Sequence, residues 1–301
     1  MTIATTIVDT EVGPLALTLD ARWLMAYAAA LGETDRRYFD TLAAAGPVAH
    51  PLFPVCYEWP AALVLRDKTI PSELQPRGVH ATHHLVVHRR PRAGDTLSTT
   101  ARVTKVEPRR TGTLVVTRFE TVDAGGQRVT TTDYGSVYRG VALADGGGVL
   151  SPLAQTPAGP EAPRANAVPS EGAPGAGSVG VRWREVVDVP ATAGHVYTEC
   201  ARIHNPIHTD VAIAREAGLS GPILHGTATL ALAVSRVIAH DLGGDPTRVR
   251  EIRGRFTGMV AMPSTLTVRG RPADGPGASF DAVGPDGTPV LGQGVVIPCD
   301  R

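Results

Sequence analysis

The sequence is poor in cysteine, in excess charge and in long apolar runs. Its three cysteines, Cys56, Cys200 and Cys299, are odd in number and far apart, which argues against a disulfide framework and favours a reducing compartment. The 29 basic and 29 acidic residues cancel, so the chain as a whole has no evident affinity for nucleic acid. No apolar run could cross a bilayer, and the N-terminal residues lack the basic and apolar regions of a signal peptide. We therefore expect a cytoplasmic protein with neither a nucleic-acid nor a membrane partner.

Length and local composition predict two domains. A chain of 301 residues suits two domains of ordinary size. From about residue 142 to 180 the sequence is rich in Gly, Pro and Ala, and such a segment neither buries a core nor keeps a regular period. We expect an N-terminal domain over residues 1–141, a linker over 142–180 and a C-terminal domain over 181–301.

Residues 197–233 hold the features around which the rest of the chain is organised. The run Asn205-Pro206-Ile207-His208 predicts a turn, because proline fixes φ and disfavours the helical region for the residue before it. A short helix is expected from 211 to 217, with Asp210 as its N-cap and Gly218 just past its end. His225-Gly226 opens a second helix, apolar on most sides, which we expect to be buried.

The strings N-P-I-H-T-D and G-P-I-L-H-G, followed by an apolar helix, resemble the MaoC-type (R)-specific enoyl-thioester hydratases and dehydratases. The resemblance implies a hot-dog fold, in which an antiparallel sheet wraps a central helix. It places His208 on the catalytic histidine and Asn205, Pro206 and Asp210 on their counterparts. The sequence departs from the motif at Ala201 and Arg202, which replace a Ser-Gly pair, and at Ile203, which stands where the family carries a catalytic aspartate.

The N-terminal part repeats this stretch in eroded form. An offset that aligns Tyr27 with Tyr197 also places Glu33, Asp35, Tyr38 and Asp40 on Ile203, Asn205, His208 and Asp210. At a larger offset, Gly46-Pro47-Val48-Ala49-His50-Pro51 matches the segment that ends in Gly226, so the short helix is trimmed in this copy. Two copies in the same order indicate a duplicated domain, and double hot-dog chains are common in the family. Since Tyr38 replaces the histidine and Pro51 has no N–H, we expect one active site per chain.

Each copy is predicted to be α+β, with one long helix among antiparallel strands. In the N-terminal copy the helix is expected from Pro54 to about Lys68, followed by strands at 81–88, 96–106, 112–122 and 128–138. In the C-terminal copy strands are expected at 181–189, 249–261, 264–271, 279–283 and 290–297. The fold prediction is therefore a tandem hot dog.

His208 and Gly226 are the candidates for chemistry. Imidazole titrates near neutral pH and can exchange a proton with water or with the α-carbon of an enoyl thioester. The N–H of Gly226, at the first turn of a helix, has no acceptor within that helix and could stabilise a thioester oxygen as negative charge develops. The alternatives are a histidine bonded to the turn backbone and a glycine that permits tight packing. We assign Asn205, Ile203, His225 and Thr227 to substrate contact.

Isoleucine at position 203 cannot supply the carboxylate that the family uses. Four nearby or pseudo-equivalent residues are possible replacements: His204, Asp210, Glu33 and Glu58. Asp210 is expected to orient the loop through its cap. Glu58 is an acidic residue in an otherwise apolar helix, where an unpartnered charge would be costly, and related acyl-carrier dehydratases pair histidine with a carboxylate from the neighbouring hot dog. Its alternative is an exposed helix position.

Two functions stay open. One is a hydro-lyase that acts on an enoyl or 3-hydroxyacyl thioester carried by CoA or a carrier protein, in fatty-acid or polyketide metabolism. The other is a catalytically altered hot-dog protein, altered by Ile203, that serves as acyl-thioester binder, thioesterase or partner subunit. We assign no cofactor and no metal, although His80, His84 and His88 share one strand parity and leave a metal site open. Hot-dog sheets often pair at an edge, so a homodimer is expected.

Overall fold

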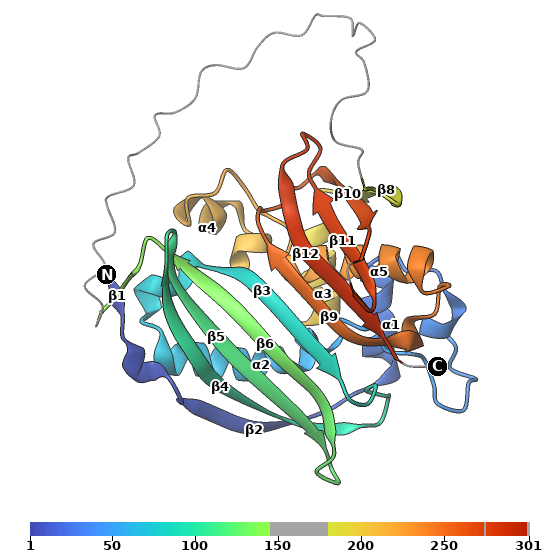
Figure 1. The fold of residues 1–301 in the computed structure, drawn as a ribbon. Helices are drawn as coiled ribbons and strands as arrows, with labels where there is room; N and C mark the ends of the chain where they lie inside the picture. The colour runs from blue at the N-terminus through green and yellow to red at the C-terminus, as the bar shows by residue number, and fades with distance from the viewer. Residues whose placement is uncertain (145–179, 274, 300–301) are drawn as a thin grey trace, which may run out of the picture.

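The computed structural model describes residues 1–144, 180–273 and 275–299, and these form an antiparallel sheet of ten strands with helices packed against it (Figure 1). The first five strands in the sheet are β2 (Glu11–Thr18), β4 (Thr96–Arg109), β5 (Gly112–Asp123), β6 (Arg128–Arg139) and β3 (Gly78–Val87). The other five are β9 (Val249–Phe256), β12 (Pro289–Pro298), β11 (Ala278–Val283), β10 (Ser264–Arg271) and β8 (Trp183–Val189).

The two halves of the sheet have the same topology and meet at β3 and β9. These two strands pair antiparallel, with Leu85 opposite Ile252 and His83 opposite Gly254. From this junction outward, the N-terminal half runs β3, β6, β5, β4, β2 and the C-terminal half runs β9, β12, β11, β10, β8. In both halves, the second strand of the half lies at the junction and the first strand lies at the outer edge. This repetition is what a duplicated domain predicts.

Each half has one long central helix and one shorter helix. The central helices are α2 (Pro54–Thr69) and α5 (Gly226–Asp241), and the shorter ones are α1 (Ala21–Ala30) and α3 (Ala193–Ala201). The C-terminal half adds α4 (Val211–Glu216), whose counterpart is missing from the described residues of the N-terminal half, as the trimmed spacing predicts. Short 3₁₀ turns occur at Thr5–Ile7, Arg36–Tyr38, Ser72–Arg77, Pro206–His208 and Pro246–Arg248.

The two central helices differ in character. Helix α5 contacts all five strands of its own half, and Leu230, Val234 and Val237 on it are fully buried. Helix α2 contacts β2, β4 and β5 and contains Pro60 in its interior. It also carries Glu58, which is buried, so the alternative of an exposed helix position is wrong.

Most predicted strands are confirmed to within a few residues, with two corrections. Strand β9 ends at Phe256 rather than 261, because the N–H groups of Thr257 and Gly258 already turn to the carbonyl of Val290. Strand β2 was not predicted. It is an edge strand that, within the described sheet, pairs only with β4, and an edge strand tolerates Gly13 and Pro14. In the sequence, the same two residues argue against a strand.

The predicted linker lies for the most part outside the described residues. Its first two residues, Ala142–Leu143, form β7, which pairs in parallel with β1 (Thr2–Ile3) in a separate two-stranded sheet. Regular structure therefore continues slightly past the predicted end of the N-terminal domain.

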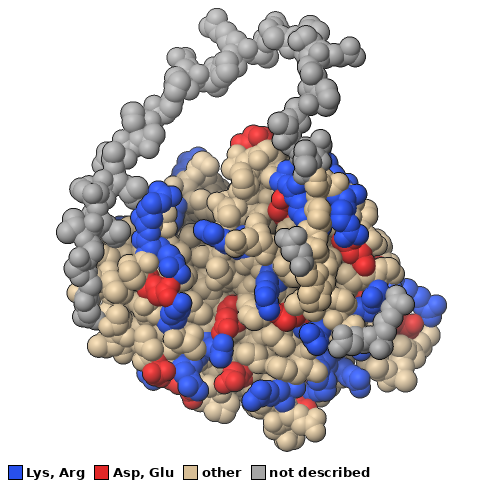
Figure 2. All heavy atoms as spheres, in the orientation of Figure 1, with Lys and Arg blue, Asp and Glu red and all other residues tan. Residues whose placement is uncertain are grey.

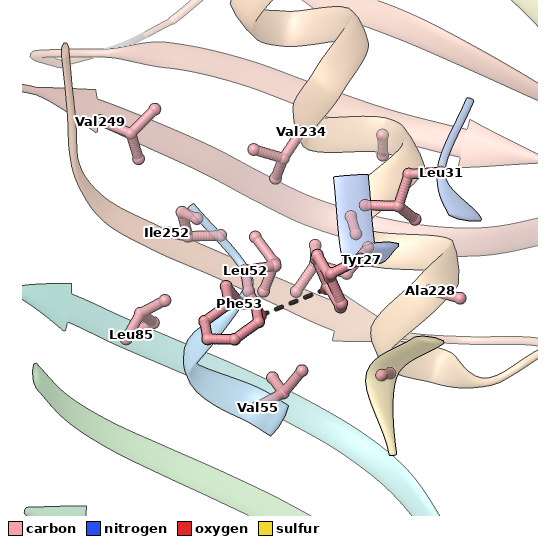
Figure 3. Packing of buried hydrophobic residues seen from close by; sticks show 14 of the residues in the cluster. Tyr27, Leu31, Leu52, Phe53, Val55, Leu85, Ala228, Val234, Val249 and Ile252 are labelled. Atoms are coloured by element: carbon pink, nitrogen blue, oxygen red, sulfur yellow. Dashed lines mark hydrogen bonds between the residues drawn. The ribbon is translucent and has the colours of Figure 1, made fainter. Parts of the chain in front are cut away.

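One hydrophobic cluster joins the two halves (Figure 3). Phe53 and Leu85 of the N-terminal half belong to the same buried cluster as Val234 and Ile252 of the C-terminal half. A second, smaller cluster lies within the N-terminal half, around Leu65, Val103 and Phe119. The shared cluster makes the packing of each half depend on the other.

A pair of tyrosines lies at the junction between α1 and α3. The hydroxyls of Tyr27 and Tyr197, which the internal repeat aligns, are 3.2 Å apart. Tyr27 also donates to the carbonyl of Leu52 at 3.3 Å, and Tyr197 donates to the hydroxyl of Thr227 at 3.0 Å. Both rings are fully buried, so the carbonyl of Leu52 and the hydroxyl of Thr227 accept the two hydroxyl protons where water is excluded.

The surface has mixed charge. Lys and Arg side chains are interspersed with Asp and Glu over the face that Figure 2 shows. None of the described helices has the length and apolar character needed to span a membrane.

We expect Tyr27→Phe to lower the free energy of unfolding by about 1 kcal/mol, because it removes one buried hydroxyl and its hydrogen bond to the carbonyl of Leu52 but keeps the ring. Urea denaturation of Tyr27→Phe, Tyr197→Phe and the double variant would measure the coupling between the two hydroxyls. Additive losses would show that the two halves are not coupled at this point.

Candidate functional site

A cavity with an empty volume of about 930 Å³ opens between the start of α5 and the side of α2. The C-terminal half contributes His208, Gly226 and Ile203 to its wall, and the N-terminal half contributes Glu58 and Trp59. The cavity is therefore built by both halves, and neither half forms it alone.

His208 is held by the turn that the sequence predicts. Residues Pro206–His208 form a 3₁₀ turn, and the Nδ1 of His208 donates to the carbonyl of Ile223 at 2.7 Å. The proton lies on Nδ1 because a carbonyl can only accept. The neutral ring then carries its lone pair on Nε2, which makes no hydrogen bond to any described residue. Burial lowers the pKa of His208 to about 4, so the imidazole is neutral at pH 7 and can accept a proton.

His225 supports His208 from one side. The two rings stack with their centroids 3.7 Å apart, and His225 is the N-cap residue of α5. Its Nε2 lies 3.3 Å from the carbonyl of Ile203 and 3.2 Å from the hydroxyl of Thr198. Burial lowers the pKa of His225, and the nearby His208 lowers it further, so this ring is also neutral. His225 thus packs against His208 without adding a charge to the cavity.

Gly226 is the first residue of α5, as predicted, and its position leaves little room for a side chain. A Cβ there would lie 3.2 Å from the Nδ1 of His80 and 3.3 Å from a ring carbon of Phe256. The N–H at this first position has no acceptor within the helix, and the helix dipole adds positive potential. A carbonyl oxygen in the cavity could therefore approach this N–H.

Glu58 is the only carboxylate among the described residues that line the cavity. Its side chain is 3% exposed, and the hydroxyl of Thr132 donates to its Oε1 at 2.6 Å. Burial raises the pKa of Glu58 to about 8 although this hydrogen bond opposes the shift. At neutral pH the cavity therefore presents a neutral imidazole and a protonated carboxyl group.

The four residues assigned to substrate contact all line the cavity: Ile203, Asn205, His225 and Thr227. Ile203 is 4% exposed and belongs to the core cluster, so the position that holds an aspartate in the family is here part of the apolar wall. The hydroxyl of Thr227 accepts from Tyr197, which links the wall to the tyrosine pair. Their roles in binding stay predictions.

The other candidates for the missing carboxylate lie elsewhere. Asp210 is exposed and accepts hydrogen bonds from the N–H groups of Ala212 and Ile213, as the predicted N-cap of α4. Its cap also fixes the chain just after His208, so its orienting role stays a prediction. His204 is exposed, next to Glu199. Neither residue lines the cavity.

Glu33 lies in the pseudo-equivalent site, away from this cavity. It accepts a short hydrogen bond from Ser235 of α5, and the Nε2 of His50 lies 3.7 Å from its Oε1. The pKa of Glu33 is raised and that of His50 is lowered to about 3, in both cases mainly by burial. This cluster is closed by its own contacts, which fits the prediction of one active site per chain.

The prediction for Pro51 needs a correction. The internal repeat aligns Pro51 with Gly226, the first residue of α5, but α2 begins three residues later, at Pro54. Residues 50–53 form an extra turn, in which the N–H of Phe53 donates to the carbonyl of His50. The first residue of α2 is nevertheless a proline, so the start of this helix also lacks the N–H that Gly226 offers.

The alternative of a metal site at His80, His84 and His88 is wrong. A bulge between His80 and Thr82 breaks the alternation, and His80 packs 5.3 Å from His83 instead of sharing a face with His84. His84 pairs with Glu251 and His88 with Thr131. No group of three or more potential metal ligands occurs in the part of the chain that the structure describes.

His80 lines the cavity, a role that the sequence analysis missed. Its ring stacks on Tyr134 at 3.9 Å and lies 4.2 Å from Phe256, while its Nε2 contacts the carbonyl of Thr82 at 3.1 Å. Only the bulge turns this residue inward, and no local pattern reveals a bulge.

Family models match both halves of the chain. Residues 196–274 match the MaoC like domain, and residues 7–132 match the FAS1-like, dehydratase domain region. Among curated proteins, the peroxisomal enoyl-CoA hydratase 2 of Arabidopsis thaliana is 44% identical over 63 residues, which are 21% of this chain and 20% of that protein. The match thus spans about a fifth of the relative's length.

Solved structures match almost the whole chain. A MaoC-like dehydratase from Phytophthora capsici superposes with a TM-score of 0.76 at 22% identity, over 98% of this chain and 97% of that one. A protein of Mycobacterium tuberculosis described as having a double hot-dog fold superposes with a TM-score of 0.57 at 20% identity, over 96% and 94% of the two chains. The predicted double hot-dog fold is confirmed. His208 and Gly226 lie within the residues that match the MaoC like domain.

Proposed function

We propose that this protein adds water to 2-enoyl thioesters or removes it from 3-hydroxyacyl thioesters. The observation that carries the proposal is that His208, Gly226 and Glu58 all line one cavity. The family match and the likeness to an enoyl-CoA hydratase support the same reaction class. The carrier is proposed to be CoA or an acyl-carrier protein.

In the hydration direction His208 acts as base and Glu58 as acid. The Nε2 of His208 takes a proton from water as the oxygen bonds to C3 of the thioester, and Glu58 gives its proton to C2. The thioester oxygen carries the developing charge and accepts from the N–H of Gly226. Environment sets these roles, since burial keeps His208 neutral and Glu58 protonated. Transfer of a proton from His208 back to Glu58, through water, restores both groups, and dehydration is the reverse.

Ile203 fits this scheme because Glu58 supplies the acid, so a carboxylate at position 203 is not needed. A cavity with Glu58 on one side and an aspartate at position 203 would hold two acidic groups near one histidine. The alternative function, an altered hot-dog protein that binds acyl thioesters without this chemistry, would not require a protonated carboxyl group in the cavity wall.

Three further features stay proposals. The division into domains 1–141 and 181–301 is supported by the sheet order, in which each half takes its strands from one part of the sequence. A homodimer is supported by the two edge strands, β2 and β8, that end the described sheet. We also keep the cytoplasmic location as a proposal.

We expect His208→Ala to lower the hydration rate of crotonyl-CoA by about 10²–10⁴-fold, because it removes the base. Loss of enoyl absorbance measures the reaction. His204→Ala is the matched control, since this neighbouring histidine is exposed and lies outside the cavity wall. Equal activity of His208→Ala and wild type would rule out the proposed base.

We expect Gly226→Pro to lower kcat more than Gly226→Ala does. Both variants add bulk beside His80, but only proline also removes the N–H, and proline is tolerated at the first position of a helix. The loss of one such donor is worth about 10²–10³-fold in kcat. Comparable kcat values for the two variants, with folding verified by circular dichroism, would refute the role of the N–H.

We expect kcat/KM for hydration to fall as pH rises through about 8, because Glu58 then loses the proton that it must donate. At the acid end the rate should fall as His208 takes up a proton near pH 4. Glu58→Gln should be slow at every pH. A wild-type rate that stays flat from pH 7 to above 9 would exclude Glu58 as the acid.

The same group gives a stability test. The pKa of Glu58 is higher in the folded protein than its ordinary 4.5, so its ionisation opposes folding. The contribution of Glu58 to the free energy of unfolding is fully present below about pH 4.5, where the group is protonated in both the folded and the unfolded state, and it is lost as pH rises through about 8. The melting temperature of Glu58→Gln should therefore decline less over this range than that of wild type.

A further inference from the structure

A second cavity, with an empty volume of about 730 Å³, continues the first one into the N-terminal half. The two cavities are adjacent, since Trp59, His80 and Tyr134 line both. The second cavity lies between α2 and strands β4 to β6. We call it the distal chamber and define it by Arg66, Thr117, Ser136 and Tyr138, which line it and not the first cavity.

The distal chamber has a polar wall where a hot-dog half ordinarily has its apolar core. Tyr134, Ser136 and Tyr138 alternate along β6, and Thr117 lies on the same face of β5, between Val115 and Phe119. The C-terminal half is an internal comparison. There the buried positions on the equivalent strands are apolar: Leu266, Val268, Phe280, Ala282 and Val296. The hydroxyl groups are therefore particular to the half that extends the cavity.

Two of these hydroxyls have no partner in the described residues. No hydrogen bond is made by the hydroxyl of Tyr138, whose side chain is buried, or by that of Thr117 within the described part of the chain. A plain alkyl chain in the chamber would displace water from both hydroxyls and leave them unsatisfied, which is costly. An acyl chain with oxygen atoms at this depth could accept from them or donate to them.

The one Lys or Arg side chain among the described residues that line the chamber, Arg66, already has a carboxylate partner. Arg66 donates to the Oδ1 of Asp67 at 3.3 Å, and Gln75, which also lines the chamber, donates to the same oxygen at 3.2 Å. The guanidinium already has a carboxylate beside it. A terminal carboxylate on the ligand would compete with Asp67 for this one cation.

We propose that the natural substrate carries neutral oxygen atoms, as hydroxyl or carbonyl groups, on the acyl chain beyond the reacting carbons, and that Tyr138 and Thr117 bind them. This inference rests on the proposed function for the placement of the thioester beside His208. It makes Tyr138 and Thr117 residues that determine specificity for the tail of the substrate, without a part in the chemistry.

The test is a binding measurement that needs no turnover. Isothermal titration of the full chain with decanoyl-CoA, 7-hydroxydecanoyl-CoA and 8-hydroxydecanoyl-CoA compares chains that differ by one hydroxyl. We expect at least one hydroxylated chain to bind about three- to tenfold tighter than decanoyl-CoA, as one or two added hydrogen bonds would give. Tyr138→Phe and Thr117→Val should reduce this preference while affinity for decanoyl-CoA stays equal or rises.

Tyr57→Phe is the matched control. It removes a buried hydroxyl, bonded to Thr130, from the same half but outside both cavities, so the preference should stay. Equal affinity of wild type for plain and hydroxylated chains would overturn the proposal, as would tighter binding of a decanedioic acid monothioester of CoA than of either hydroxylated chain. Crotonyl-CoA hydration is measured separately. If wild type does not hydrate crotonyl-CoA, the proposed reaction is refuted. The binding comparison would still test whether the distal chamber prefers hydroxylated chains.

Discussion

The pairing of β3 with β9 is the contact on which the rest of this structure depends. It joins two five-stranded halves into one sheet and lets a single hydrophobic cluster run through both. Phe53 of the N-terminal half and Ile252 of the C-terminal half both belong to this cluster, so the two halves share much of their core. The same junction decides where the cavity forms, since it brings the side of α2 opposite the start of α5.

Duplication has allowed the two halves to divide their work. The C-terminal half keeps an apolar α5, the histidine turn and the glycine at the helix start. At the equivalent place in the N-terminal half, Glu33 and His50 form a closed cluster with Ser235 of α5. The N-terminal half has also gained a carboxyl group on α2 and hydroxyls on β5 and β6. Buried polar groups of this kind lower the stability of the fold. We therefore connect them with the binding of a ligand.

Burial is the main influence on the titratable groups of the cavity. It moves the pKa values of His208 and Glu58 in opposite directions, because it disfavours the charged form of each. In an exposed pair with the same side chains, the carboxylate would be ionised at neutral pH and the imidazole would be partly protonated. In the cavity both are neutral, which suits a reaction that takes one proton from water and gives another to carbon.

Local sequence patterns predicted most of the elements and the repetition of the two halves. Proline at 206, the cap at Asp210 and the apolar run after Gly226 act over a few residues, so local physical chemistry fixes the histidine turn and both helices that follow it. Tertiary structure decided which distant groups meet. Glu58 shares a cavity with His208 because α2 packs against the other half, His80 turns inward because of a bulge, and Asp210 and Glu33 are used elsewhere. These outcomes depend on the junction of the two halves and on strand register, which no short stretch of sequence encodes.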